Sequence, residues 1–242
     1  MKLTIAVPAY NEQEVLVKSV QTLHAFCLRE LSGYDWRLVI ADNASTDQTA
    51  VLGQAVARSL ERVSYVLVAD RGKGAAVLGG WAAHPAEVYA FTDADLATDP
   101  EALPLALAQI TAGGELVMGS RFHAGLAVQR TRIRKTFSYG YRWLARLLLA
   151  TKLRDLPCGF KVIRHQTLQA VLPQVRDREW FFDSELTLRA EASGRRVVEV
   201  PVKWHEPRSR HAPSRVAVIN VSRAYAGKLW QLRRELKHTH RV

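Results

Sequence analysis

Cysteine is scarce in this chain, which has only Cys27 and Cys158, far apart in the sequence. Neither is spaced with a second Cys or a His as the ligands of a zinc site are, so a zinc-centred module is excluded. With no cysteine framework to read, we expect a reduced protein of the cytoplasm.

Long apolar runs are missing as well. The best candidate is interrupted by four cations, Arg142, Arg146, Lys152 and Arg154, so we expect that the chain does not cross a membrane by itself. The N-terminal run from Leu3 to Pro8 is too short for the core of a signal peptide and predicts the first strand instead.

Acidic residues are outnumbered, 23 Asp and Glu against 34 Lys and Arg, which gives a formal net charge of +11. Such an excess favours an anionic partner: a nucleotide, a lipid phosphate, an acidic membrane surface or nucleic acid. Much of it lies in residues 130–154 and 208–241. No helix-turn-helix, RNA-binding sheet motif or zinc finger supports the nucleic-acid reading.

Internal repeats and low-complexity tracts are absent, and 48% of the 242 residues are apolar. This length and composition predict one α/β domain with a substantial core. Strand-like runs at 3–7, 38–41, 65–68, 88–92 and 116–119 alternate with helical stretches near 13–31, 46–60, 73–83 and 100–110. The alternation predicts parallel strands joined by right-handed crossovers.

The pattern changes after residue 119. We expect a helix from about 131 to 153, a strand at 160–163, a helix near 184–192, a strand at 197–202 and a basic C-terminal helix. The interpretation is a single domain over 1–242, in which about 1–120 bind a nucleotide, about 121–216 form the acceptor half and about 217–242 form the basic helix.

Polar clusters follow the first four predicted strands. They are residues 8–12, 42–47, 71–74 and 92–99. In open α/β sheets ligands bind beyond the carboxyl ends of the strands, so four clusters at one edge predict a ligand site there.

The most informative cluster holds Asp93 and Asp95 directly after an apolar strand. Side chains alternate along a strand, so these two carboxylates can leave its end on the same side and converge on one hard cation. Such a cation would bridge diphosphate oxygens. The alternative is a solvated acidic turn, because Asp is a common turn residue.

Two further clusters have their own readings. In the 42–47 cluster, Ser45 and Asp47 suit capping of the next helix, whereas the carboxylate of Asp42 suits hydrogen bonds from a base or ribose. In the 71–74 cluster, two cations and two glycines precede a helix, which predicts a phosphate at the helix N-terminus. The Walker A loop and the dinucleotide fingerprint are both missing.

Taken together, these pieces resemble the inverting glycosyltransferases of family two, which have a GT-A fold. The motifs that carry the resemblance are residues 8–12, 42–47, 71–74, 93–95 and 119–121, in the order and spacing of the family. Within it, residues 93–98, 155–161, 180–186 and 198–204 resemble the dolichyl-phosphate glucosyltransferase and polyprenyl-phosphate branch. The resemblance runs from residue 3 to about 216 and implies a mostly parallel central sheet flanked by helices.

The resemblance also implies a site. Donor nucleotide-sugar contacts fall on Pro8, Ala9, Tyr10, Asn11, Glu12, Asp42, Asn43, Arg71, Lys73, Asp93 and Ala94. Catalytic roles fall on Asp93, Asp95, Arg121, Arg134 and Asp183, with Asp95 binding Mg²⁺ or Mn²⁺. The acceptor phosphate is assigned to Arg121, Arg134 and, in a basic loop that departs from the family's compact element, Arg210 or Arg215.

Several assignments keep a plainer alternative. Arg134 is equally well interpreted as one more solvated helix charge. The resemblance places the acidic pair Asp183 and Glu185 in the site, near the acceptor, and the alternative is that both charges complement a helix dipole. The aromatic and basic helix around Trp143 suits either a membrane interface or an ordinary core-facing position.

The expected function is transfer of a hexose, with glucose from UDP-glucose as the best guess, onto a polyprenyl or dolichyl phosphate. We expect it to act peripherally at the cytoplasmic face of a membrane and not on nucleic acid. The runner-up is a GDP-mannose-dependent mannosyltransferase; from a different class, a non-catalytic nucleotide-sugar or nucleic-acid binder stays open.

Overall fold

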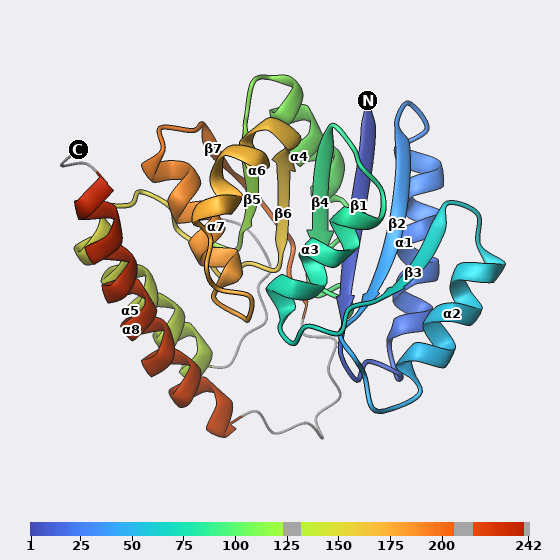
Figure 1. The fold of residues 1–242 in the computed structure, drawn as a ribbon, viewed down its shortest axis with the longest axis horizontal. Coiled ribbons are helices and arrows are strands. Elements are labelled where there is room, and N and C mark those ends of the chain that lie inside the picture. The colour runs from blue at the N-terminus through green and yellow to red at the C-terminus, as the bar shows by residue number, and fades with distance from the viewer. Residues whose placement is uncertain (123–131, 206–214, 240–242) are drawn as a thin grey trace.

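The computed structural model describes residues 1–122, 132–205 and 215–239, with the backbone alone for 132–138, 215–223 and 238–239. A seven-stranded sheet in the order β3-β2-β1-β4-β6-β5-β7 runs through the middle of the molecule (Figure 1). The strands are β1 Lys2–Ala9, β2 Asp35–Asp42, β3 Val63–Leu67, β4 Val88–Thr92, β5 Leu116–Ser120, β6 Phe160–Arg164 and β7 Val197–Pro201. The predicted mostly parallel α/β class is confirmed.

Helices cover both faces of the sheet. On one face lie α1 Leu16–Glu30, α2 Thr49–Ser59 and α4 Ala102–Thr111, and on the other α3 Lys73–Ala83, α6 His165–Val171 and α7 Phe182–Ala192. The short α6 and the 3₁₀ turn Leu172–Gln174 that follows it were not predicted from the sequence. Beyond the β7 edge, α5 Arg132–Leu149 and α8 Arg215–Thr239 lie side by side (Figure 1).

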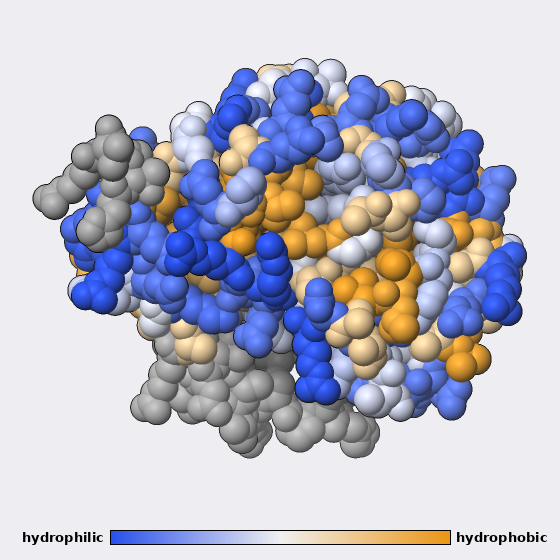
Figure 2. Space-filling view, viewed as in Figure 1, coloured by the Kyte–Doolittle hydropathy of each residue, from blue (hydrophilic) through white to orange (hydrophobic). Residues whose placement is uncertain are grey.

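Each face of the sheet has its own apolar core. Leu3, Ile5 and Leu103 belong to one core, and Trp81, Phe91 and Phe182 to the other. Strand β4 is buried along its whole length, as expected of a central strand covered on both sides. Figure 2 shows hydrophilic side chains over the α7 and α8 side and apolar ones nearer the middle of the same face.

Strand β6 breaks the parallel order that the alternation predicts. It lies antiparallel between β4 and β5, so that Thr92 at the end of β4 pairs with Phe160 at the start of β6. An antiparallel neighbour begins where β4 ends. The residues just before β6 therefore lie at the same edge as Asp93, whose N–H donates to the Gly159 carbonyl at 3.2 Å.

In the part of the chain that the structure describes, no helix is both long and apolar enough to span a bilayer.

Candidate active site

The loops after β1 and β2 meet at the carboxyl edge of the sheet, as predicted. Asn11 has a left-handed backbone, with φ of 53°, and its side-chain oxygen accepts the N–H of Thr46 at 2.8 Å. Its own N–H donates to the Ser45 hydroxyl at 3.0 Å. Tyr10 beside it is 56% exposed. The two loops thus form one surface with an exposed aromatic ring.

Asp42 lies beneath this surface and is fully buried. One carboxylate oxygen accepts the Ser45 N–H at 3.1 Å and hydroxyl at 2.5 Å, and the other accepts the Tyr65 hydroxyl at 2.7 Å. The prediction that Ser45 caps a helix is wrong: α2 begins only at Thr49, whose N–H donates to Asp47 at 2.9 Å. The hydroxyl of Ser45 is used on Asp42 instead.

The N-terminus of α3 is closed by protein groups. The N–H groups of Gly74 and Ala75 donate to the carbonyls of Glu179 and Arg178 at 3.2 and 2.9 Å. The Gly72 N–H donates to the Asn43 side chain at 2.7 Å. These three backbone donors already have partners, so they are not available to the phosphate that the sequence suggests at this helix terminus.

Lys73 is the centre of the site. Its ammonium lies 2.7 Å from Asp93 and 2.8 Å from Asp183, and its side chain is only 8% exposed. The rings of Phe91 and Trp180 lie 5.2 and 5.7 Å from the same nitrogen, within the range of cation–π attraction. Burial by itself lowers the pKa of the ammonium, but Asp183 and Asp93 outweigh it, so the pKa is raised.

This contact joins residues 110 apart in the sequence. Asp183, at the start of α7, comes from the predicted acceptor half, and Lys73 and Asp93 from the predicted nucleotide half. A buried lysine that holds two carboxylates stays charged and fixes their positions. The second oxygen of Asp183 is buried with no hydrogen-bond partner in the described structure.

Two carboxylates stand where the sequence predicts a metal. The side chain of Asp93 is 37% exposed, and Asp95 follows through a tight turn in which Leu96 has φ of 46°. One oxygen of Asp95 accepts the Ala97 N–H at 3.1 Å. Among the described residues no three His, Cys, Asp or Glu side chains gather as a metal cage. One or two carboxylates that leave room for substrate phosphates are what Mg²⁺ prefers, so the residues fit such an ion.

Arg121 is held by a residue that sequence reasoning missed. Its Nε and Nη2 both lie 2.6 Å from the two oxygens of Asp155, and its backbone N–H donates to the same carboxylate at 2.8 Å. Asp155 is 1% exposed. Burial lowers the pKa of the guanidinium, but Asp155 outweighs it and the pKa is raised. Asp155 is the first residue of the 155–161 motif of the family resemblance, which is the signal from which it could have been predicted.

The two acidic residues at the start of α7, Asp183 and Glu185, have different partners. Asp183 points to Lys73, but Glu185 accepts the backbone N–H groups of Arg176 and Asp177 at 3.1 and 2.7 Å and the Nε of Arg189 at 2.7 Å. The predicted role of Glu185 in the site is wrong, because two positions along a helix point in different directions.

Three predicted acceptor residues have side chains outside the described part of the structure. Arg210 lies outside the described residues. For Arg134 in α5 and Arg215 at the start of α8, only the backbone is described. Arg71 is exposed beside the α3 terminus, and Ala94 is buried behind Asp93.

Residues 4–172 match the model of glycosyl transferase family 2. The chain belongs to this family. The chain is 29% identical to glycosyltransferase AglD of Haloferax volcanii over its whole length, and it spans 39% of that protein. It is 28% identical to dolichyl-phosphate beta-glucosyltransferase of Saccharomyces cerevisiae over 84% of this chain and 67% of that one.

A third relative carries a different sugar in its name. Polyprenol monophosphomannose synthase of Mycolicibacterium smegmatis is 30% identical over 84% of this chain and 77% of its own length. Among solved structures, glucosyl-3-phosphoglycerate synthase of Mycobacterium tuberculosis, in complex with Mn²⁺, UDP and phosphoglyceric acid, superposes with a TM-score of 0.72. It covers 96% of this chain and 78% of that one at 18% identity, which shows the shared GT-A fold.

Proposed function

We propose that this member of glycosyltransferase family 2 moves a hexose from a nucleotide-sugar to a polyprenyl or dolichyl phosphate, with inversion at the anomeric carbon. Glucose from UDP-glucose is the proposed donor. The observation that carries the proposal is the Lys73 ammonium between Asp93 and Asp183, which joins residues of the proposed donor and acceptor halves. The names of the relatives support the acceptor class.

The donor would lie across the loops after β1, β2 and β4. Tyr10 and Asn11 offer exposed surface for the nucleoside, and Asp93 faces the sugar and diphosphate. Asp42 acts here by holding Ser45 in place, since both of its oxygens already accept hydrogen bonds.

Asp95, with Asp93 beside it, would hold Mg²⁺ or Mn²⁺. When bound, such an ion stabilises the negative charge that develops on a leaving diphosphate. Lys73 contributes a fixed positive charge next to Asp93, in a site where burial makes electrostatic interactions stronger than in water.

The acceptor phosphate needs positioning more than it needs a base. A phosphomonoester with a second pKa of about 6 is largely dianionic at neutral pH, so its oxygen is already nucleophilic. Arg121, whose Nε and Nη2 are held by Asp155, is the proposed first cation for such a phosphate, and Arg134 on α5 is the proposed second cation.

The aromatic residues of α5 support a peripheral membrane contact. Tyr139, Trp143 and Leu147 recur every four residues and are 56%, 64% and 60% exposed, so they form one exposed apolar row. Arg142 and Arg146 accompany them, a composition that suits a lipid headgroup layer. Cosedimentation with vesicles containing anionic lipid should be weakened by Trp143→Ala.

The test of the proposed function is transfer of label from UDP-glucose or GDP-mannose to a short polyprenyl phosphate, with Mn²⁺, Mg²⁺ or chelator. Metal-dependent transfer from UDP-glucose is expected. Transfer from GDP-mannose alone would keep the mechanism and change the donor, as the mannose-synthase relative suggests. No lipid product from either donor, with nucleotide binding intact, would overturn the acceptor assignment.

Thermal shifts with UDP and GDP give an independent reading of the base, because a ligand that binds the folded state raises the melting temperature. Arg134→Ala should lose lipid-acceptor turnover, and unchanged turnover would remove Arg134 from the site.

A further inference from the structure

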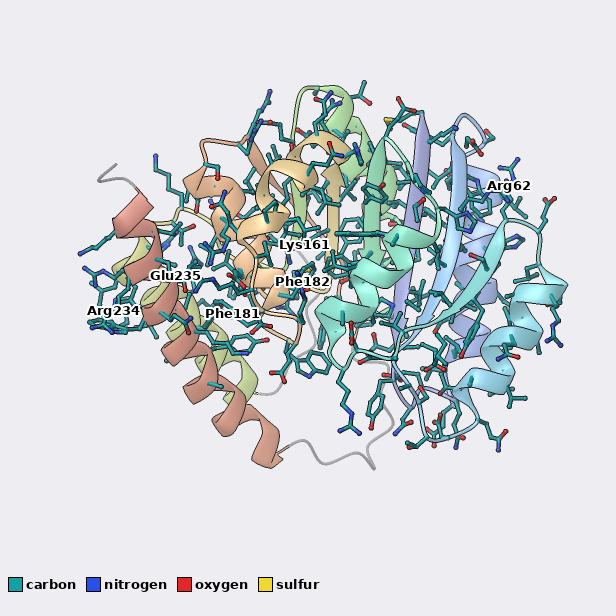
Figure 3. All side chains as sticks on the ribbon, viewed as in Figure 1. Arg62, Lys161, Phe181, Phe182, Arg234 and Glu235 are labelled. Atoms are coloured by element: carbon teal, nitrogen blue, oxygen red, sulfur yellow. The ribbon has the colours of Figure 1, made fainter. Side chains whose placement is uncertain are left out.

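Lys161 is a fully buried lysine near the start of β6, with no exposed surface. The strand residues on either side of it, Phe160 and Val162, are apolar core residues. Figure 3 shows Lys161 in the central part of the ribbon, and its ammonium lies 5.7 Å from the centre of the Phe91 ring. Buried lysines are rare unless they have partners, because taking the charge out of water is costly.

The partners of Lys161 are two backbone carbonyls of one loop. Its ammonium donates to the carbonyl of Leu156 at 3.0 Å and to that of Cys158 at 2.9 Å. Both belong to the segment 155–159, which we name the 155–159 loop. Burial lowers the pKa of the ammonium, and the negative charge of Asp183 nearby offsets only part of this effect, so the pKa stays below its usual value.

The 155–159 loop touches the site at both of its ends. At one end Asp155 holds Arg121 through both carboxylate oxygens. At the other end the Gly159 carbonyl accepts the Asp93 N–H, and Gly159 lies so close to Asp93 that an added Cβ would be 1.8 Å from its carboxylate. Between the ends, the Cys158 N–H donates to the Asp155 carbonyl at 3.0 Å, which closes a tight turn.

We propose that Lys161 is a positioning residue, which holds the 155–159 loop through the carbonyls of Leu156 and Cys158 and thereby fixes Arg121 and Asp93 together. The effect of Lys161 on kcat/KM rests on the proposed function. Lys161 itself has no exposed surface with which to contact a substrate, so its effect passes through the loop. One buried cation thus sets the spacing between the acceptor-side arginine and the donor-side aspartate.

Lys161→Met tests this idea, because methionine keeps the length and removes the donors. Arg164→Met is the matched control: Arg164, at the other end of β6, also donates to two carbonyls, of Gly114 and Ile110, but far from the site along the strand. We expect Lys161→Met to lower kcat/KM about 100-fold, the effect of misplacing reacting groups by about 1 Å, and Arg164→Met to lose stability with little change in kcat/KM.

A double-mutant cycle separates positioning from general destabilisation. If Lys161 acts through the loop, adding Asp155→Asn to Lys161→Met should cost little beyond the larger single effect. Effects that multiply, measured well below both melting temperatures, would overturn the proposal. So would equal losses in Lys161→Met and Arg164→Met.

Hydrogen exchange gives a readout that needs no turnover. Without any donor, the amides of Asp93 and Cys158 should exchange faster in Lys161→Met than in wild type, and no faster in Arg164→Met. Unchanged exchange would overturn the positioning role even if the enzyme proved to use another acceptor. Lys161→Gln, which keeps an N–H donor, serves for the same comparison if the methionine variant does not fold.

Discussion

Replacing Gly159 by alanine should damage the site while sparing the fold. A Cβ at this position would lie 1.8 Å from Oδ2 of Asp93, 2.4 Å from its Cγ and 2.7 Å from Oδ1. Opening the shortest contact to the 3.4 Å of ordinary van der Waals contact requires a shift of about 1.6 Å. The backbone at Gly159 is fixed by β6 and by its bond to the Asp93 N–H, so the carboxylate has to move.

The displaced carboxylate has somewhere to go, since the Asp93 side chain is 37% exposed. Moving outward lengthens the 2.7 Å ion pair with Lys73, which keeps its second partner, Asp183. We therefore expect a stability loss of about 1–2 kcal/mol. A misplacement of this size costs on the order of 100-fold in rate, which corresponds to about 2.7 kcal/mol of transition-state stabilisation.

The assay is metal-dependent transfer from UDP-glucose, compared at a temperature where wild type and variant are both folded. Gly33→Ala is the control, because a Cβ there meets nothing within 4 Å, and it should keep full activity. A fully active Gly159→Ala enzyme with an unchanged melting temperature would refute the reasoning about Asp93.

Asp95→Asn should lose most activity and keep its melting temperature, since Asp95 lies at a partly exposed strand end; full activity in the variant, or in excess chelator, would contradict the metal role. Asp183→Asn should lower turnover by weakening the Lys73 pair, whereas Glu185→Gln should lower the melting temperature; the opposite pattern would exchange their roles. Burial and the hydrogen bond to Asp42 raise the pKa of Tyr65 from 10.0 to about 12. Between those pH values the folded protein keeps a proton that the unfolded chain loses, so this stability is full below pH 10 and declines as pH rises through the window. Denaturant unfolding of Tyr65→Phe should lack that part of the decline; an identical pH dependence would show that Tyr65 ionises normally.

The strands and the edge of the site followed from local patterns. The apolar run 88–92, with Asp93 directly after it, predicted a buried strand and a polar group beyond its end, and both are observed. Strand periodicity carries this information in a few adjacent residues.

Pairings across the fold did not follow from the sequence. Nothing near Lys73 marks Asp183 as its partner. The carbonyls of Arg178 and Glu179, which accept the N–H groups at the start of α3, also lie far away in the sequence. Ser45 was predicted as a helix cap because capping is a local sequence signal. Its hydroxyl instead donates to Asp42, a buried carboxylate that needs hydrogen-bond donors. Lys161 reads as an ordinary charged residue until its strand is seen to be central.

The reversed strand β6 has a consequence for building chimaeras. Because β6 lies between β4 and β5, the C-terminal part of the chain supplies the backbone that packs against Asp93. A hybrid joined near residue 121 would therefore import a foreign Gly159 and Lys161 into the donor side along with the new acceptor side. Exchange of acceptor preference between relatives should succeed only when the β4–β6 seam is transplanted as a unit or kept whole.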